Sequence, residues 1–504
     1  MAIKAAKTAK KGPKQATQSK KANTPARKYT MSDLPELKTN LISTSASVRK
    51  SAAKGIYELS DVSHKKNRTS IVRSGWGIVS NIIECIRMSE GDPRHLALLT
   101  LNNLSIPSEN KRAFIEEERK DEVMGILVHI IKDDPAESYL ACICAMNLSF
   151  LESSIPSISS YPGLLPTLTT LLSEGVSAKA GSGKSESVRW AAGLLKNLSR
   201  DKEAAIDIAE TSILSSLLTT LKNPSSASRW SSNSTEDFAL FTILHLSQYE
   251  SSILVSPAGD VFNKLNVSSI LQPIAKSAVG SHSLKASLAM AVLRDTKGSM
   301  IPKEAGEDIV KLTKNVLEKK GEEGTYSAGV FKLSTALQAL KGVSSKCAVD
   351  TFATPVAAAL MLQVIASYTL ASRESPISNV SPSSDALTVF SKLLPVIANQ
   401  KIPKTGPTSE TPEYSKAVAE ITSLVSAYKT IDPSSETLVT STTQTLSGYT
   451  GLRPSVLEAA EIWKEQRERD GVVARFYEGE KGQEVTEDGP LSFLPCNTNE
   501  CVIL

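Results

Sequence analysis

A nine-residue pattern recurs six times between Ala52 and Arg294, with apolar residues at its first, fifth and eighth positions. Apolar residues at this spacing lie on one face of an α-helix. The seventh residues of successive copies are 45, 44, 50, 48 and 47 residues apart, a period typical of helical solenoids in which each unit packs on its neighbours. The copies are Ala52–Ser60, Ala97–Ser105, Ala141–Ser149, Ala191–Ser199, Ala239–Ser247 and Ala286–Arg294.

Two shorter amphipathic segments precede the pattern in most copies, as Glu109–Ile131 and Asp201–Leu221 illustrate. A short, a medium and a long helix, the last with an Ala-x-x-x-Leu-x-Asn-Leu-Ser core, resemble the armadillo repeat. The resemblance is clearest over Asn67–Ser247, and HEAT repeats are its structural neighbour. It implies an all-α fold, namely a right-handed superhelical solenoid of armadillo or HEAT-like repeats.

Composition divides the chain into four segments. Residues 1–30 are rich in Lys, Ala, Gln and Thr, and we expect a disordered basic tail there. Residues 31–300 hold the six recognisable units, whereas residues 301–475 are predicted to form divergent helical repeats and capping helices between Pro- and Ser-rich joints. Residues 476–504 are predicted to be a flexible tail.

Charge and cysteine usage favour a cytoplasmic protein, with the nucleus as the alternative. Met1–Lys28 holds nine of the 57 basic residues and no acidic one, which leaves 48 basic against 53 acidic residues elsewhere. That balance argues against nucleic acid as the partner. The lysine-rich tail predicts contact with anionic lipid, a nuclear signal around Lys10–Lys14, or a solvated end. No apolar secretory segment opens the chain, and the cysteines show no paired spacing.

One run, Thr351–Ser372, contains 22 residues without a charge. It is long enough to span a bilayer. Its proline, glutamine and threonine residues and its high share of alanine favour instead a helix that is buried inside the array.

The chain ends in Cys501-Val502-Ile503-Leu504, a CaaX prenylation box whose final leucine favours a geranylgeranyl group. One prenyl chain gives only marginal membrane attachment, so a second signal is expected. Cys496 is a candidate palmitoylation site or an ordinary cysteine, and the Met1–Lys28 lysines could add electrostatic attraction. These features predict a protein tethered to the cytosolic face of a membrane by a prenyl group on Cys501.

The second candidate site is a groove along the long helices. Positions −1, 3 and 7 of the pattern lie opposite the apolar face and are predicted to line a concave surface. The resemblance implies that successive asparagines at position 7 bind the backbone of an extended peptide; the alternative is that they brace adjacent turns. The predicted groove residues are Asn103, Asn147, Asn197, His245, Tyr139, Arg189 and Phe241.

No enzyme signature, metal site or cofactor is predicted. The segment Ala178–Ser185 fits a relaxed phosphate-binding pattern, but it lacks the preceding strand that the motif needs. The five histidines lie in separate repeats without ligand spacing. The leading hypothesis is therefore a non-enzymatic scaffold or adaptor that holds a protein partner in its groove. The alternatives are a regulator of small GTPases and a nuclear adaptor of the armadillo type.

Overall fold

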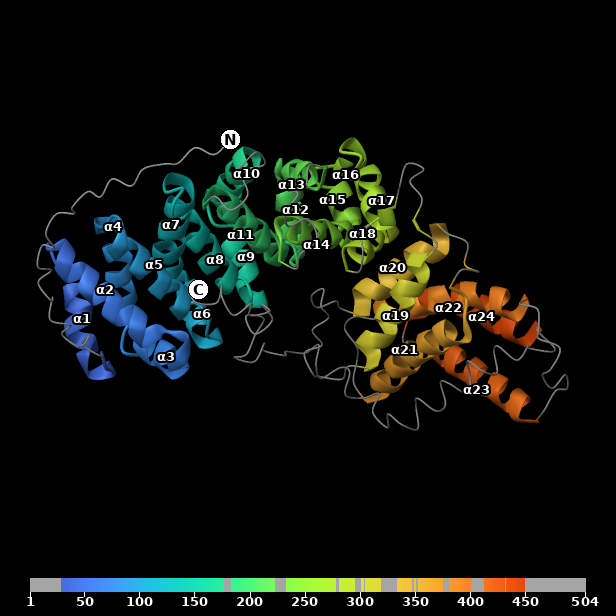
Figure 1. Cartoon of the computed structure of the whole chain (residues 1–504). Coiled ribbons are helices and arrows are strands. Elements are labelled where there is room, and N and C mark those ends of the chain that lie inside the picture. Colours follow the sequence, from blue (N-terminus) through green and yellow to red (C-terminus); the bar gives the residue numbers. More distant parts are fainter. Residues whose placement is uncertain are drawn as a thin grey trace, which may run out of the picture.

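The computed structural model describes residues 29–175, 183–222, 233–277, 281–294, 301–302, 304–318, 333–346, 349, 352–374, 381–399, 412–430 and 432–448. Within these residues every regular element is a helix and none is a strand. Figure 1 shows the helices packed side by side in an elongated array, from α1 at one end to α24 at the other. The all-α prediction is confirmed, whereas the handedness of a superhelix and the type of repeat stay predictions.

Nine helices of the described chain form a continuous row, named row A, in which each helix packs against the next. The first six carry the nine-residue pattern, and the last three extend the same row into the region of divergent sequence. Row A comprises α2 (Ala46–Ser60), α5 (Asp92–Leu104), α8 (Ser138–Leu148), α11 (Gly183–Leu198), α14 (Thr235–Gln248), α18 (Ser281–Val292), α20 (Leu333–Lys346), α22 (Ser381–Asn399) and α24 (Glu436–Gly448).

A second set, row B, lies alongside, and each of its helices packs on the row A helix that follows it in the chain. Row B comprises α1 (Leu34–Asn40), α4 (Gly77–Met88), α7 (Glu117–Asp133), α10 (Leu164–Gly175), α13 (Ile213–Lys222), α17 (Val267–Ser277), α19 (Glu304–Glu318), α21 (Pro355–Glu374) and α23 (Pro412–Tyr428). Neighbouring row B helices contact one another from α1 to α17 and again from α19 to α23.

Short helices distinguish the two halves of the array. Up to α18, at least one short helix follows each row A helix before the next row B helix begins, so the unit has three parts. Beyond α18, the described helices alternate between rows B and A, and the short elements between them are 3-10 turns, at Val349 and between α23 and α24. The short elements are η1 (Met31–Asp33), η2 (Val62–His64), α3 (Lys65–Arg73), α6 (Ser108–Ile115), η3 (Glu152–Ser154), α9 (Ile155–Ser159), α12 (Lys202–Glu210), α15 (Glu250–Leu254), α16 (Val261–Lys264) and η5 (Pro433–Ser435).

The apolar face predicted from the pattern forms the core between repeats. In α11, Ala191, Leu195 and Leu198 are fully buried, as positions 1, 5 and 8 require. Row A helices between α2 and α24 are nevertheless buried on more than this one face, because each lies between two row A neighbours and a row B helix. Burial on several sides explains why α8 is apolar over most of its circumference.

Described residues contain no single helix that is both long and apolar enough to cross a membrane, although two sharply bent helix pairs meet that test together. The pairs are α8 with the η3–α9 segment, and α12 with α13. The uncharged run at residues 351–372 lies largely in α21, which packs against α22 and α23. Ala358, Leu362 and Ile365 are buried there, in agreement with a helix inside the array.

Candidate binding surface

The asparagines at position 7 of the pattern connect consecutive row A helices. Each side-chain amide donates a hydrogen bond to the serine hydroxyl that closes the pattern one repeat earlier. The Nδ2–Oγ distances are 3.3 Å for Asn103–Ser60, 3.2 Å for Asn147–Ser105 and 3.1 Å for Asn197–Ser149. This geometry corresponds to the bracing interpretation and extends it, because the bond reaches the neighbouring repeat.

The serines explain why the pattern ends in Leu-Ser. Each hydroxyl donates to the carbonyl oxygen three residues earlier, as Ser149 does to Met146 at 2.7 Å, so its oxygen is left to accept from the asparagine. A serine at this place satisfies a carbonyl at the C-terminal end of its own helix and anchors the next repeat. The fixed two-residue spacing between Asn and Ser is visible in the sequence. A single repeat does not show, however, that the asparagine bonds the serine of the repeat before it.

His245 takes the place of asparagine in α14. Its Nδ1 lies 3.0 Å from Oγ of Ser199 and 3.1 Å from the carbonyl oxygen of Lys196. Because the Ser199 hydroxyl already donates to that same carbonyl, both neighbours of the ring act as acceptors and Nδ1 carries the proton. The ladder of position 7 to position 9 contacts thus runs from α2 to α14.

The predicted open stripe differs from the structure at two of its three positions. Asn103, Asn147 and Asn197 are only 6%, 2% and 3% exposed. Position 3 is also buried, and a Cβ at Gly193 would lie 3.0 Å from Sδ of Met146 and 3.1 Å from Cε2 of Phe238. Row A helices approach one another so closely that these positions contact adjacent repeats instead of forming an open wall.

Position −1 keeps partly exposed side chains in three successive helices. Both carboxylate oxygens of Glu137 lie within 3.1 Å of Nδ1 of His95, and this hydrogen bond raises the pKa of the histidine. Tyr139 is partly buried against the core. Arg189 donates to the carbonyl oxygen of Asn233 at 2.8 Å and stacks on Trp190. The predicted groove residues Tyr139 and Arg189 therefore reach the surface, together with His95 at the same position of the pattern.

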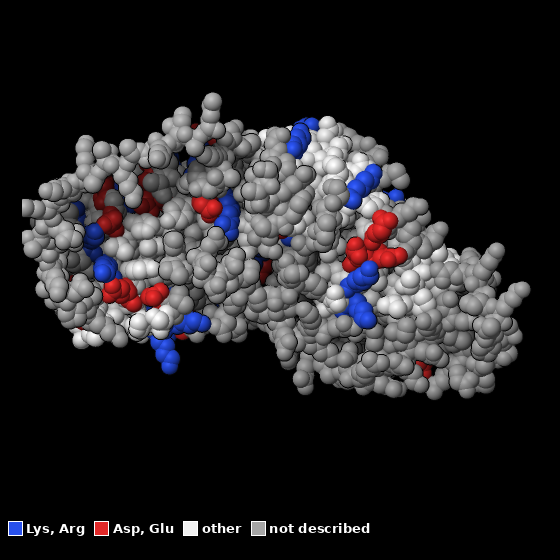
Figure 2. Space-filling model, viewed as in Figure 1, with Lys and Arg blue, Asp and Glu red and all other residues white. Residues whose placement is uncertain are grey.

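Charges in the first repeats are paired. Arg94 lies 2.7 Å from Asp134, and Arg73 lies 2.5 Å from Glu109. Figure 2 shows acidic and basic side chains together around a hollow near the position of α5. This part of the surface carries both signs of charge at short range.

A different pattern occurs where α11, α14 and α18 meet. Asp237, which is buried, pairs with Lys285 and lies 2.9 Å from Nε2 of His282. Phe241, also buried, lies between two ammonium groups, with Nζ of Lys285 4.1 Å and Nζ of Lys196 4.7 Å from its ring centre. The predicted groove residue Phe241 is therefore part of a cation–aromatic cluster rather than an open surface.

Two further cations extend this cluster toward the preceding repeats. Arg200 follows α11 and donates to the carbonyl oxygens of Ser149, at 2.7 Å, and Asn197, at 3.1 Å. Lys111 on α6 places its Nζ 5.5 Å from the ring centre of Phe150. We name Lys111, Lys196, Arg200 and Lys285 the basic track. Among the described residues, neither Lys111 nor Lys196 has a hydrogen bond or ion pair to a carboxylate.

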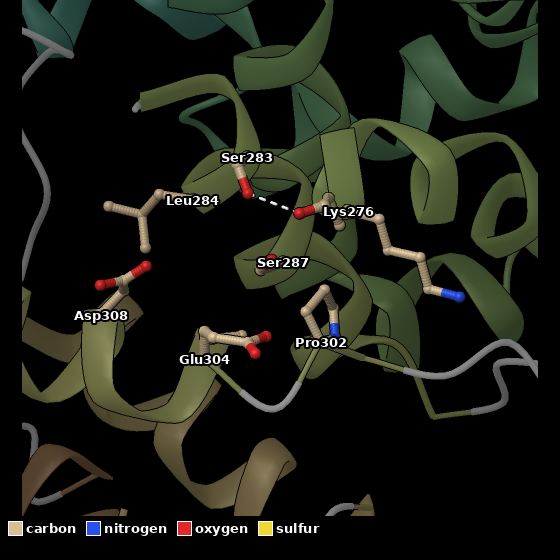
Figure 3. A pocket seen from close by; sticks show the side chains of 9 residues that line it. Lys276, Ser283, Leu284, Ser287, Pro302, Glu304 and Asp308 are labelled. Carbon is tan, nitrogen blue, oxygen red and sulfur yellow. Dashed lines mark hydrogen bonds between the residues drawn. The ribbon is translucent and has the colours of Figure 1, made fainter. Parts of the chain in front are cut away.

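A small cavity of about 260 Å³ lies between α17, α18 and α19. Figure 3 shows Ser287, Glu304 and Asp308 around it and the Lys276 side chain directed away. Ser283 donates to the carbonyl oxygen of Ala275 at 2.6 Å, which uses its donor. The volume is below the usual range for small-molecule sites. No group of three metal-ligating side chains occurs in the described part of the chain.

Cys496 and Cys501 lie outside the described residues, as do residues 1–28 and most of the loop that resembles a phosphate-binding motif. The prenylation and palmitoylation predictions therefore stay predictions.

Comparisons with known proteins yield structural matches of low similarity. No family model and no curated protein matches the chain. One solved structure, described as an engineered protein, has 20% identity and a TM-score of 0.42, and covers 52% of this chain and 96% of its own. Another, from work on a phosphorylation switch in the cadherin–beta-catenin interaction, has 15% identity and a TM-score of 0.32, and covers 82% of this chain and 94% of its own.

Proposed function

We propose that this chain is a non-enzymatic helical-repeat scaffold that binds a protein segment along row A and is tethered to a membrane by a prenyl group on Cys501. The observation that carries the first part is the continuity of row A. Its helices follow one another without interruption from α2 to α24 and present one long surface made of many repeats. Solenoids use such extended surfaces to bind other proteins.

The repeat type that we propose changes along the chain. Three-part units up to α18, with a short helix before each pair, support an armadillo assignment. Alternation of paired helices beyond α18 is closer to the HEAT arrangement. Both types expose one helix row for partners, so the proposed function does not depend on the distinction.

Support for the tether comes from the sequence alone. A cysteine followed by two aliphatic residues and leucine is the substrate pattern of a geranylgeranyl transferase. A single chain of this kind binds membranes marginally, so the lysines of Met1–Lys28 or an acyl group on Cys496 would complete the attachment. The cytosolic face of a membrane is the location that follows.

Membrane fractionation of the full chain in cells tests the tether. Cys501→Ser should move the protein to the soluble fraction, because it removes the thiol of the CaaX box that would carry the prenyl group. Leu504→Ser is the matched control, since it keeps the cysteine and shifts the preference from geranylgeranyl to farnesyl. Retention of Cys501→Ser on membranes after alkaline carbonate washing would contradict the tether. Accumulation in the nucleus would favour the nuclear-adaptor alternative.

Proximity labelling of the same full chain tests the binding surface. Combined Tyr139→Ala and Arg189→Glu changes should reduce the labelling of bound proteins, because both side chains reach the surface of row A. Lys132→Glu on row B is the matched control, since Lys132 is exposed on the other row. Equal labelling by both variants, with unchanged melting temperatures, would place the partner elsewhere.

A further inference from the structure

The basic track carries more positive charge than its surroundings neutralise. Asp237 is bonded to Lys285 and also attracts Lys196, and within the described residues the one further carboxylate that acts on the track is Glu152 near Arg200. Burial is the largest factor that lowers the pKa of Lys196 to about 8, and it does the same for Lys111. Four cations held away from water with two carboxylates among them destabilise the fold, and a bound anionic group would relieve that penalty.

We infer that the basic track, through its partly exposed residues Lys196 and Arg200, is a docking site for the acidic segment Glu478–Asp488 of this chain's own C-terminal region. Lys285 is fully buried and adds positive charge to the site without contacting the segment. This inference rests on the proposed use of row A as a surface for protein segments. The segment contains five acidic residues and one lysine. Its charge is therefore complementary to that of the track, and opposite charge guides both encounter and register.

The chain is long enough for this contact. The 29 residues between Gly448 and Glu478 span about 45 Å as a helix, the form predicted for residues up to 475, and up to about 100 Å when extended. From α24 back to α11 there are five steps along row A, which amount to about 40–50 Å at usual helix spacings. An attached segment also has an effective concentration in roughly the millimolar range, far above that of most free partners.

Docking of this segment leaves the tether usable. Twelve residues separate Asp488 from Cys501, which corresponds to a reach of about 40 Å. The prenylated cysteine can therefore still reach a membrane while the acidic segment lies on the track. The same contact would compete with any partner segment for the track, so the tail acts as an internal competitor.

Zero-length carbodiimide cross-linking of the full chain tests the contact. Cross-links should join Lys111 or Lys196 to Glu484, Glu487 or Asp488, and mixtures of isotopically labelled and unlabelled protein should show that they form within one chain. Salt at about 1 M should abolish them, because it screens charges beyond about 3 Å. Cross-links found only between different chains, or none at all, would overturn the proposal.

A titration separates tail docking from nonspecific anion binding. The control protein is the full chain with the tail acids neutralised (Glu478→Gln, Glu480→Gln, Glu484→Gln, Glu487→Gln and Asp488→Asn). A synthetic peptide of residues 476–490 should bind this variant at least about ten-fold more tightly than the wild-type chain, whose track is already occupied. Adding Lys111→Gln and Lys196→Gln should remove that binding, whereas Lys132→Gln and Lys202→Gln should not.

Three results would overturn the proposal. The first is equal affinity of the peptide for the wild-type and the neutralised chain. The second is equally tight binding of a peptide that carries the same neutral substitutions. The third is displacement of the peptide from the track by an equal concentration of inorganic sulfate. None of these results bears on the release of Cys501→Ser from membranes or on partner labelling through Tyr139 and Arg189. Failure of tail docking is thus distinguishable from failure of the proposed function.

Discussion

The two halves of the array have the same arrangement of helices but different connections between repeats. From α2 to α14, an Asn or His side chain of one row A helix bonds the closing serine of the helix before it. From α18 onward, other groups connect the units: Lys346 donates to the carbonyl oxygens of Met290 and Ala291, Lys341 pairs with Asp385 at 2.6 Å, and Ser383 bonds Tyr428 at 2.7 Å. The fold therefore continues where the sequence pattern ends.

This difference shows what a repeat fold requires. Burial of an apolar helix face is common to both halves, as full burial of Leu198 in α11 and Leu393 in α22 illustrates. The polar connection is exchangeable, because any well-placed donor and acceptor can satisfy the exposed helix ends. A sequence repeat thus reflects one particular polar connection, whereas the helical array depends on the apolar face.

The largest expected effect tests the shared apolar core. Leu198→Asp and Leu393→Asp should each lower the free energy of unfolding by about 3–5 kcal/mol, because each introduces an unpaired charge into a fully buried site. Urea denaturation followed by circular dichroism measures the loss, and hydrogen exchange locates it. Faster exchange should concentrate in the helices next to the substitution, since repeats contact only their neighbours. A variant as stable as the exposed control Lys202→Asp would refute the assigned helix faces.

The next effect concerns close helix approach in the two halves. A Cβ at Gly342 in α20 would overlap the carbonyl oxygen of Ala291, which belongs to the backbone of α18. Gly342→Ala should therefore cost about 2–3 kcal/mol, because a backbone must move. Gly193→Ala meets only the ends of the Met146 and Phe238 side chains and should cost less than about half of that. Thermal unfolding compares them, and the opposite order would show that α18 and α20 are packed less tightly than α8 and α11.

A smaller effect separates the two kinds of polar connection. A double-mutant cycle with Asn197→Ala and Ser149→Ala should give a coupling of about 1 kcal/mol that salt barely changes, because both partners are neutral and buried. The corresponding cycle with Lys341→Met and Asp385→Asn should weaken in salt, since Lys341 is half exposed. Equal salt dependence of the two coupling energies would contradict the distinction between a neutral connection in the first half and an ionic one in the second.

Spacing within one helix predicted the helices and their buried faces well. Positions 1, 5 and 8 are buried because a period of 3.6 residues follows directly from local sequence. The hydrogen-bond partner of the position 7 asparagines could not be predicted. It depends on the register between two neighbouring helices, and the pattern within one helix carries no information about that register. Gly193 illustrates the same limit, since its contacts come from α8 and α14.

The basic track was missed for a related reason. Lys111, Lys196 and Lys285 are far apart in the sequence and look like ordinary charged positions on amphipathic helices. Packing of the repeats brings these lysines into one cluster, and burial then lowers the pKa of each. Only Lys196, at position 6 of a pattern that is otherwise Asn, Met, Leu, Tyr or Ala there, offered a local signal.

The smallest effect contrasts a cation without a carboxylate partner in α11 with a paired one in α20. Burial lowers the pKa of Lys196 from 10.5 to about 8 in the folded state, and the test uses the chain with neutralised tail acids as the parent. Between these values the unfolded chain binds more protons, so the free energy of unfolding rises with pH. Lys196→Met in this chain removes a penalty that is present below about pH 8 and should be more stable than its parent near pH 7 by on the order of 1 kcal/mol. That advantage should vanish near pH 10, where the folded parent has lost the charge.

Lys341→Met should instead lower the free energy of unfolding near neutral pH, because it leaves the buried carboxylate of Asp385 unpaired. Urea denaturation across this pH range measures both, and a loss of stability on Lys196→Met near pH 7 would mean that Lys196 has the counter-ion that Lys341 has.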